Sequence, residues 1–431
     1  MAEEVEITGM VYGGDGFGRL ADGRAVFVPF VLPGERLLVE LVEEKRGHAR
    51  GRLKTILRSS PERVTPRCAH FGTCGGCHYQ HMPYNAQLRV KEQIVREQFV
   101  RIAGVSEPPL RPIQPSPEAW YYRNTVQFHL DEQGKPGYQE AGSHRVVPIS
   151  ECHLPQEILA QTWPLLDLEP LPGLERIILR AGAGDELLLA LEGSGEAMPE
   201  FSVDLPLSAV YLGPAGSMVL AGDDGLMFEV LEKPFHVSAG SFFQVNTAQA
   251  GAMVQYLLER LPLGKETTLL DVYCGVGLFS AFMAPRVGRC VGIELSSSAC
   301  EDYAANLDAC DNVELYVGAA EDVLPALDLK ADIVLVDPPR AGLERAALDA
   351  IVALAPATLA YVSCDPSTLA RDVKRLIAAG YELNEVKPFD LFPQTFHVET
   401  IVLMSRIKDC SEKSAYFVLI RKFGASATGL I

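Results

Sequence analysis

Cys364 stands in this sequence where a thiol could act as a nucleophile. It follows the apolar run TLAYVS, and Pro366 stands where the first turn of the next predicted helix begins. Backbone N–H groups and the dipole at a helix N-terminus favour the thiolate, which is the nucleophilic form, although the carboxylate of Asp365 opposes this effect. A lone cysteine is more often an inert core residue. We keep that interpretation for four other cysteines, Cys274, Cys290, Cys300 and Cys310.

A glycine turn and a carboxylate indicate a nucleoside cofactor. The apolar run TTLLDVY leads into residues 274–277, CGVG, where two glycines let the backbone turn tightly and approach a ligand. Glu294 ends the next predicted strand, where its carboxylate can accept hydrogen bonds from two ribose hydroxyls. A dinucleotide fingerprint has a third glycine, but Ser280 stands there, which favours S-adenosylmethionine over NAD. The alternative is a tight turn beside a surface glutamate.

Two further carboxylates are candidates for the same site. Asp337 begins the turn DPPR directly after the apolar run ADIVLV. Amino-methyltransferases use a similar turn with an aromatic residue next, and Arg340 in that position weakens the interpretation as an N-methyltransferase. Glu399, in the segment HVET, is the acid that we select as a general base, although a glutamate at the start of a strand is commonplace.

Four cysteines in the first half of the chain have the pattern of a metal site. Cys68, Cys74 and Cys77 form C-x5-C-x2-C in a glycine-rich segment, and Cys152 lies far downstream. Three clustered thiols and one remote thiol match the ligand set of a [4Fe-4S] cluster. Four thiolates also suit a structural zinc ion, so both metals stay open. We interpret the neighbouring histidines as loop residues: His70, His78, His81 and His153.

The apolar pattern predicts the elements that position these residues. Short runs separated by glycine turns before residue 57 predict a small β-barrel, and residues 84–103 have a helical period. A β-rich segment with one helix near 155–163 follows. From residue 266, apolar strands alternate with helices, which predicts an α/β fold with a doubly wound sheet that binds ligands at the carboxyl ends of its strands. We therefore place a barrel at 1–60, a cysteine loop, helix and β-rich central domain at 61–240, a Rossmann-like domain at 241–407 and a tail of unassigned role at 408–431.

The composition narrows the cellular location and the binding partners that we expect. The opening of the 431-residue chain carries no apolar leader, and no apolar run reaches the roughly 18 residues of a membrane span, so we expect a cytoplasmic protein with reduced cysteines. A net charge of −18 argues against broad electrostatic binding of nucleic acid. Residues 45–67 nevertheless carry eight lysines and arginines against one acid, Glu62. This basic stretch is either a phosphate-binding surface or an ordinary solvated face.

Taken together, the motifs resemble those of the TRAM-domain RNA uracil-5 methyltransferases, which modify 23S ribosomal RNA and, in some lineages, transfer RNA. The similarity covers residues 4 to about 407. Its most specific segments are GGDGFGRLADGRAVFVPFVLPGE, CAHFGTCGGC with Cys152, SFFQVN, DVYCGVGLFS, VDPPR, VSCDP and HVET. It implies a class I methyltransferase domain at 241–407, an RNA-docking TRAM barrel, and S-adenosylmethionine and a [4Fe-4S] cluster as cofactors. RNA is the implied partner, with no membrane and no obligate protein partner.

The resemblance also implies roles for single residues. Cys364 would add to carbon 6 of a uridine, and Glu399 would remove the proton from carbon 5 after methyl transfer. The residues that would bind S-adenosylmethionine are Gln244, Tyr273, Glu294 and Asp337, with Phe243 lining the same pocket. Arg123 and Asn124 match a family segment near the RNA.

Some features depart from the family pattern or leave the target open. Leu278 stands where several members have Asn, the segment at 318–322 lacks an Asn often found near the adenine, and the end of the chain is unusual. Ribosomal RNA is favoured because bacterial transfer RNA members typically lack both the barrel and the cysteines, whereas archaeal-type members keep them. The competing interpretations are a cytosine-5 methyltransferase and an inactive iron-sulfur RNA-binding protein.

Overall fold

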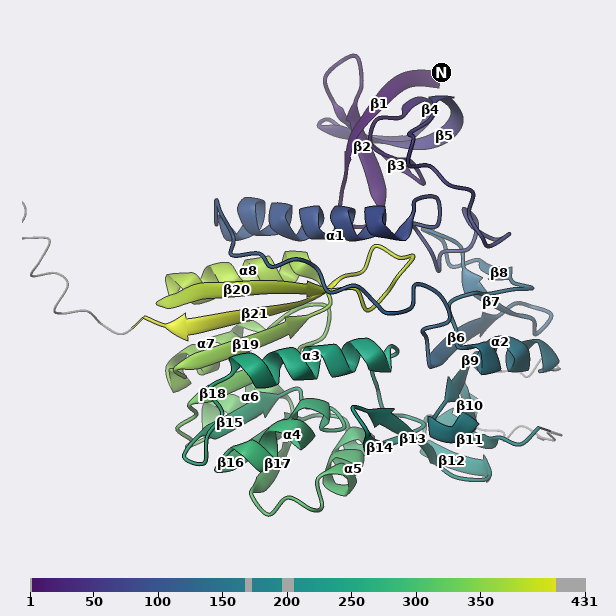
Figure 1. Ribbon diagram of the computed structural model, residues 1–431. Coiled ribbons are helices and arrows are strands. Elements are labelled where there is room, and N and C mark those ends of the chain that lie inside the picture. Colours follow the sequence, from purple (N-terminus) through teal and green to yellow (C-terminus); the bar gives the residue numbers. More distant parts are fainter. Residues whose placement is uncertain (1, 167–172, 196–204, 408–431) are drawn as a thin grey trace, which may run out of the picture.

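The computed structural model describes residues 2–166, 173–195 and 205–407. The predicted tail at 408–431 lies outside these residues. A barrel, a central sheet and a larger α/β unit follow one another along the chain, and helix α1 (Tyr84–Gln98) lies between the barrel and the α/β unit (Figure 1). Among the described helices, none has the length and apolar character needed to cross a membrane.

The N-terminal strands close into a barrel in the order β1-β2-β3-β5-β4. Their bounds are β1 Ala2–Met10, β2 Asp15–Arg19, β3 Ala25–Pro29, β4 Arg36–Glu44 and β5 His48–Arg58. Side chains alternate between core and solvent along β1, so Val5 and Ile7 pack inward while their neighbours face water. The small barrel predicted from glycine-separated apolar runs is confirmed.

The predicted helix over residues 84–103 consists of two parts. α1 passes into a π-helical turn, η1 (Phe99–Ala103), which ends at Gly104 in the left-handed conformation with φ 75°. Val95 and Phe99 are fully buried and pack in the same cluster as Leu369 and Val373 of helix α8 (Pro366–Ala378). The helix therefore packs against the α/β unit, although it lies some 170 residues before it in the sequence.

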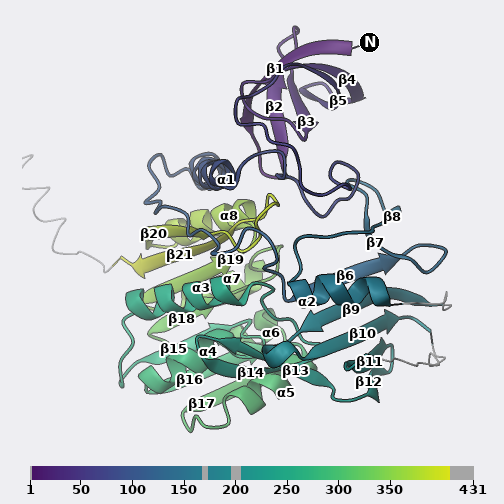
Figure 2. The same cartoon turned by 45° about the vertical axis from the view of Figure 1, so that its right-hand side comes forward.

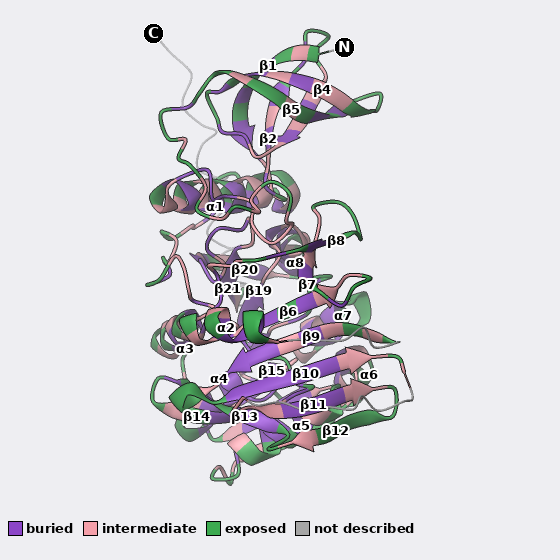
Figure 3. Ribbon diagram, turned by 90° about the vertical axis from the view of Figure 1, so that its right-hand side faces the viewer, coloured by how far each residue is buried: buried purple, intermediate pink, exposed green. Residues whose placement is uncertain are grey.

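The middle of the chain forms a mixed seven-stranded sheet, which confirms the β-rich prediction. Its order is β12-β11-β10-β9-β6-β7-β8. The strands are β6 Thr125–Leu130, β7 Pro136–Gln139, β8 Val146–Pro148, β9 Leu174–Ala181, β10 Leu187–Gly193, β11 Ser208–Gly213 and β12 Gly216–Ala221. Helix α2 (Glu157–Thr162) covers one face, where Leu159 and the following Trp163 pack on Phe128. Figure 3 shows β9 and β10 largely buried and the edge strand β12 exposed.

The C-terminal sheet has the order β17-β16-β15-β18-β19-β21-β20. Its strands are β15 Thr268–Val272, β16 Arg289–Glu294, β17 Val313–Val317, β18 Ile333–Val336, β19 Thr358–Ser363, β20 Tyr381–Phe389 and β21 Glu399–Arg406. The first five are parallel, and β21 and β20 run antiparallel to them. The predicted doubly wound fold is confirmed, whereas β20 was not predicted because the run YELNEVKPF mixes polar and apolar residues without clear alternation.

Helices cover both faces of this sheet (Figure 2). They are α3 Thr247–Arg260, α4 Leu278–Met283, α5 Ser297–Asn306, α6 Ala320–Ala326, α7 Arg345–Leu354 and α8. The hairpin β13 (Gly225–Val230) and β14 (Lys233–Ser238) packs in the same hydrophobic cluster as α3. This hairpin lies before residue 240, where the sequence predicts the start of the Rossmann-like domain, and that boundary stays a prediction.

Candidate active site

The strand ends bring the predicted site residues to one edge of the C-terminal sheet. Tyr273 follows β15, Glu294 ends β16, Asp337 follows β18 and Cys364 follows β19. These four strands are parallel, so their carboxyl ends share an edge. Glu399 begins β21, which runs antiparallel to β19, and its first residue therefore lies at the same edge. The sheet topology thus assembles residues that are spread over 127 positions of the sequence.

Backbone groups hold the carboxylate of Glu294 against the glycine turn. Its Oε2 accepts a hydrogen bond from the N–H of Gly275 at 2.9 Å, and its Oε1 accepts from the N–H of Leu295 and of Ser296, each at 2.8 Å. Gly277 has φ 88°, and a side chain there would collide with Leu307. A carboxylate has about four lone-pair positions, so Glu294, which already accepts three hydrogen bonds, keeps capacity for about one ribose hydroxyl.

Carboxylates surround the Cys364 thiol. Burial, reinforced by Glu399, raises the pKa of Cys364 to about 12, while Arg340 acts in the opposite direction. The N-terminus of α8 therefore does not decide the charge of this thiol, which is protonated at neutral pH without ligands. From the sequence we expect the helix to favour the thiolate and Asp365 to oppose it, and burial together with the neighbouring carboxylates favours the thiol form in the ligand-free protein.

The acids of this edge also influence one another. Burial raises the pKa of Glu399 well above its ordinary value, and the nearby Asp337 adds to this effect while Arg340 opposes it. Burial and the charge of Asp271 raise the pKa of Asp337 to about 7. A cation placed at this edge would therefore lower the pKa of several groups at once.

The turn that carries Cys364 is fixed by its neighbour. Asp365 caps α8, because its Oδ1 accepts hydrogen bonds from the N–H of Ser367 at 2.8 Å and of Thr368 at 3.1 Å. The Thr368 hydroxyl donates to the carbonyl of Arg340 at 3.1 Å. The DPPR turn and the turn that carries Cys364 are thereby held together.

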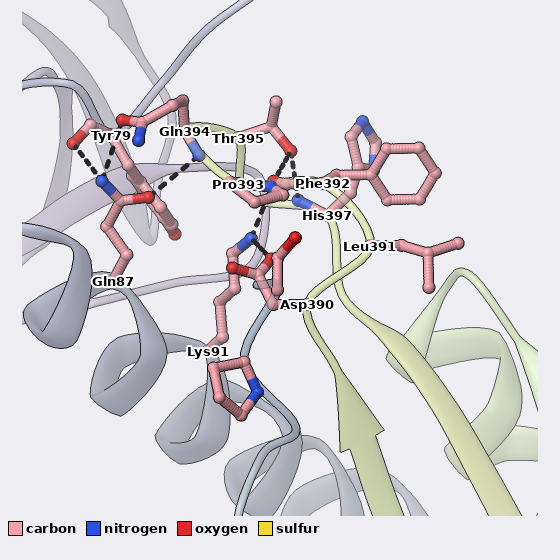
Figure 4. Close-up of polar contacts among 12 residues, drawn as sticks. Tyr79, Gln87, Lys91, Asp390, Leu391, Phe392, Pro393, Gln394, Thr395 and His397 are labelled. Carbon is pink, nitrogen blue, oxygen red and sulfur yellow. Dashed lines mark hydrogen bonds and ion pairs between the residues drawn. The ribbon is translucent and has the colours of Figure 1, made fainter. Parts of the chain in front are cut away.

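Helix α1 anchors the loop 390–398 that precedes Glu399 (Figure 4). Lys91 Nζ donates to Asp390 Oδ1 at 2.6 Å and to the Phe392 carbonyl at 2.9 Å, with both charged side chains fully buried. Gln87 donates to Gln394 Oε1 and accepts from the Gln394 N–H, both at 2.9 Å. These contacts hold Gln394, a non-glycine residue with φ 70°, in the left-handed conformation.

Gln244 lies between the central sheet and this loop. It is 8% exposed, and its carbonyl accepts a hydrogen bond from Asn124 Nδ2 at 3.0 Å. Asn246 caps α3 and donates from Nδ2 to the Leu391 carbonyl at 3.3 Å. Phe243 packs on Phe228 in the hydrophobic core, and its expected place beside the cofactor stays a prediction.

Phe242, which directly precedes Phe243, is exposed to solvent. Phe242 is 70% exposed, although it lies only two positions before Gln244. An exposed aromatic side chain of this size beside a candidate ligand-binding residue is a functional candidate that the sequence analysis missed. The signal was the pair of phenylalanines in SFFQVN, of which only one can enter the core.

Two family models match separate parts of this architecture. The TRAM domain model matches residues 2–54, and the tRNA (Uracil-5-)-methyltransferase model matches residues 226–407. An RNA methyltransferase of Thermosynechococcus vestitus is 35% identical over 93% of this chain and 97% of its own length. One of Halalkalibacterium halodurans is 34% identical over 93% and 96%. Both are described as uncharacterized RNA methyltransferases.

The chain belongs to the TRAM-domain RNA uracil-5 methyltransferases. It is also similar to a solved structure, the tRNA (uracil-54, C5)-methyltransferase of Pyrococcus abyssi in complex with S-adenosyl-L-homocysteine. That similarity has a TM-score of 0.71 and 26% identity, and it covers 94% of this chain and 100% of the other. Family and fold support S-adenosylmethionine-dependent methylation of uracil carbon 5 in RNA as the activity.

The methyltransferase also carries a cysteine cavity outside the sheet edge. The thiols of Cys68, Cys74, Cys77 and Cys152 line it together with Arg123. Burial raises the pKa of Cys74 to about 11 and that of Cys77 to about 12. Across residues 2–166, 173–195 and 205–407, no three His, Cys, Asp or Glu side chains are grouped so as to hold a single metal ion. The structure thus brings the four predicted ligands to one cavity but shows no metal site.

Most cations of the basic stretch at 45–67 form ion pairs with carboxylates of the same protein. Six of the eight cations at 45–67 pair with carboxylates: Lys45 with Glu43, Arg50 with Asp15, Arg52 and Lys54 with Glu40, Arg58 with Glu6, and Arg63 with Glu35. Arg67 instead donates to the Tyr121 hydroxyl at 2.9 Å. Phosphate groups would have to compete with these internal pairs, so the stretch is less positive than its sequence suggests.

Proposed function

We propose that Cys364 is the nucleophile and Glu399 the general base of this methyltransferase. The observation that carries the proposal is the placement of both residues at the ends of the adjacent strands β19 and β21, where each lies among the same carboxylates. Methylation of a ring carbon requires a thiolate that adds to carbon 6 and a carboxylate that takes the proton from carbon 5.

The steps follow from the chemistry of uracil. The Cys364 thiol loses its proton to solvent, the thiolate Sγ forms a bond to carbon 6, the carbon 5–carbon 6 double bond opens, and the ring becomes an enolate. S-adenosylmethionine, when bound, supplies the methyl group and a sulfonium cation. After carbon 5 has been methylated, Glu399 takes the proton from carbon 5. The double bond then re-forms and Cys364 leaves as a thiolate. Glu399 releases its proton and the thiolate takes one up, so both residues return to their starting state.

Four residues are proposed to hold S-adenosylmethionine: Gln244, Tyr273, Glu294 and Asp337. Two observations support the fit. The carboxylate of Glu294 faces the glycine turn and has about one lone-pair position left for a ribose hydroxyl. Asp337 is a buried carboxylate at the same edge and would be stabilised by a sulfonium cation.

We propose that Cys68, Cys74, Cys77 and Cys152 hold a [4Fe-4S] cluster. The shared cavity supports this, because a cubane needs four thiols that surround a space larger than one ion. Arg123 on the cavity wall would offset part of the negative charge of four thiolates. Chemical analysis of anaerobically purified protein should find about four iron atoms and four sulfides per chain. One zinc ion per chain and no iron would replace this proposal with a structural zinc site.

Ribosomal RNA is the proposed substrate, bound with the help of the barrel. The combination of barrel and cysteine motif supports it over the bacterial transfer RNA members of the family, which typically lack both. A specific observation favours transfer RNA as the second candidate, namely the similarity along the whole chain to the Pyrococcus abyssi transfer RNA enzyme.

One experiment tests the reaction and separates the candidates. Transcripts of 23S ribosomal RNA and of transfer RNA are incubated with the purified protein and S-adenosylmethionine, digested, and analysed by nucleoside mass spectrometry. We expect 5-methyluridine in the ribosomal transcript. Product in the transfer RNA alone would change the substrate, 5-methylcytidine would change the reaction, and no product in either would refute the proposed function.

A further inference from the structure

A turn of the barrel reaches the nucleophile. The segment between β1 and β2 contains Tyr12, followed by Gly13 and Gly14 with φ 106° and 93°. Tyr12 Oη donates a hydrogen bond to the carbonyl of Cys364 at 3.4 Å, across 352 positions of the sequence. In Figures 1 and 2 the lower end of the barrel lies above the loop between β20 and β21. The TRAM barrel therefore touches the backbone of the proposed catalytic residue.

The same turn packs against the loop that leads to Glu399. The ring of Tyr12 contacts Phe396 edge-on, with 5.4 Å between the ring centroids and 90° between the planes. His78 contacts Phe396 from another side at 4.6 Å, and a side chain at Gly14 would meet His78 at 3.2 Å. Glycine at position 14 thus allows the close approach of the turn to the aromatic cluster.

The Tyr12 hydroxyl has a second acceptor beside it. Burial and the carboxylate of Asp365 raise the pKa of Tyr12 above its ordinary value, so the hydroxyl keeps its proton and acts as a donor at any physiological pH. Asp365 caps α8 and directly follows Cys364. The single proton of the Tyr12 hydroxyl is thus donated to the Cys364 carbonyl, with the Asp365 carboxylate close to the same hydroxyl.

We propose that Tyr12 is a positioning residue that holds the Cys364 turn, so that the barrel completes the active site of the methyltransferase. This inference rests on the proposed role of Cys364. A hydrogen bond to the Cys364 carbonyl restrains the backbone that carries the thiol, and a displacement of about 1 Å at a reacting group can lower a rate by about 100-fold. RNA binding by the barrel is a separate property and does not require this contact.

The test separates positioning from docking. Full-length Tyr12→Phe keeps the ring contact with Phe396 and removes only the hydroxyl. The matched control is Tyr381→Phe, which also removes a hydroxyl that donates to a backbone carbonyl, that of Pro356 at 3.2 Å, but at the opposite edge of the sheet. Both variants and the wild type are incubated with S-adenosylmethionine and a 23S ribosomal RNA transcript made with 5-fluorouridine, or a transfer RNA transcript made likewise if that is the RNA methylated. Fluorine at carbon 5 cannot be removed as a proton, so the Cys364 adduct persists and its formation can be timed.

At saturating RNA, Tyr12→Phe should form the adduct about 10-fold more slowly than the wild type. The dissociation constants for RNA and S-adenosylmethionine should stay within about two-fold, because the hydroxyl contacts neither in this proposal. Tyr381→Phe should form the adduct at the wild-type rate. Thermal unfolding of each variant shows whether the fold is intact.

The outcomes distinguish a failure of the covalent mechanism from a failure of the positioning role of Tyr12. If the wild type forms no adduct, the covalent mechanism fails before Tyr12 is tested. If the wild type forms the adduct and Tyr12→Phe does so at the same rate, the positioning role is refuted. Weaker RNA binding with an unchanged rate at saturation would also overturn it, since Tyr12 would then act only in docking.

Discussion

Lys91 Nζ lies 2.6 Å from Asp390 Oδ1, and neither side chain is exposed to solvent. The pair joins helix α1 to the loop that leads to Glu399, so a helix encoded early in the chain supports the edge of the sheet where the proposed catalytic residues lie. Asp390 Oδ2 is buried without a hydrogen-bond partner within the described part of the chain. The charge of Lys91 is therefore the main interaction that stabilises this buried carboxylate.

Removal of Lys91 should therefore destabilise the protein strongly. Lys91→Met leaves the Asp390 carboxylate buried and unpaired, which should lower the free energy of unfolding by about 3–5 kcal/mol. Urea unfolding measures this loss. The double variant Lys91→Met, Asp390→Leu should recover much of it, because no buried charge remains. Equal stability of the single and double variants would show that the charge pair is not the cause.

An exposed ion pair provides the control for this effect. Arg345 and Asp349 pair on the surface of α7 with 86% and 66% of their side chains exposed. Arg345→Met makes a similar change in charge and size, yet it should leave the urea midpoint unchanged because solvent screens the pair.

Replacement of Cys364 should abolish methylation without loss of cofactor binding. Cys364→Ala removes the thiol that is proposed to add to carbon 6, and no other group at the sheet edge supplies it in the proposed mechanism. We expect no 5-methyluridine above the blank and an affinity for S-adenosylmethionine within about three-fold of the wild type. Cys310→Ala, the same change away from this edge, should retain activity. Turnover by Cys364→Ala would rule out the covalent mechanism.

Replacement of Glu399 should trap the reaction after methyl transfer. The amide of Glu399→Gln cannot accept the carbon-5 proton, so the methylated base stays bonded to Cys364. A protein–RNA complex that resists denaturing electrophoresis should accumulate and should carry radioactivity from methyl-labelled S-adenosylmethionine. A complex without label would indicate that Glu399 acts before methyl transfer, and no complex would assign the base to another residue.

The residues at the carboxyl edge of the sheet could be predicted from the sequence more fully than the residues that hold them in place. Cys364, Asp337 and Glu294 could be placed because each directly follows an apolar strand, and parallel strands of one sheet end at one edge. Nothing local indicates that Tyr12 reaches the Cys364 turn, since that contact depends on how two units pack. Lys91 did leave a signal: with Gln87 it forms a polar pair at i, i+4 on the buried face of a predicted amphipathic helix.

Asp271 should make the stability of the protein depend on pH. Burial raises its pKa from 3.8 to about 7, although Ser280 Oγ donates to Oδ2 at 2.6 Å. The folded state therefore binds this proton more tightly than the unfolded state. Its stabilising contribution is full below pH 3.8 and is lost as the pH rises to about 7. Asp271→Asn should reduce the fall in unfolding free energy between pH 5 and 8, by about 1.4 kcal/mol for each pKa unit removed. An unchanged pH dependence in urea unfolding would contradict the assignment.

The reactivity of Cys364 should respond both to pH and to the charge of the cofactor. Since the thiol has a pKa of about 12 in the ligand-free protein, its thiolate fraction should rise about ten-fold per pH unit. Alkylation by iodoacetamide, followed on the Cys364 peptide by mass spectrometry, should rise with unit slope from pH 7 to 9.5 without a plateau. A plateau below pH 9 would mean that the protein already stabilises the thiolate.

The sulfonium cation should then be what prepares the thiol for attack. A positive charge beside Asp337 offsets the carboxylates that raise the Cys364 pKa, so S-adenosylmethionine should increase the alkylation rate at fixed pH. S-adenosylhomocysteine is the matched control, because it has nearly the same shape without the charge and obstructs the reagent to a similar degree. A rate with S-adenosylmethionine several-fold above that with S-adenosylhomocysteine is expected. Equal rates would mean that the thiol is activated by the RNA or by Glu399 and not by the cofactor.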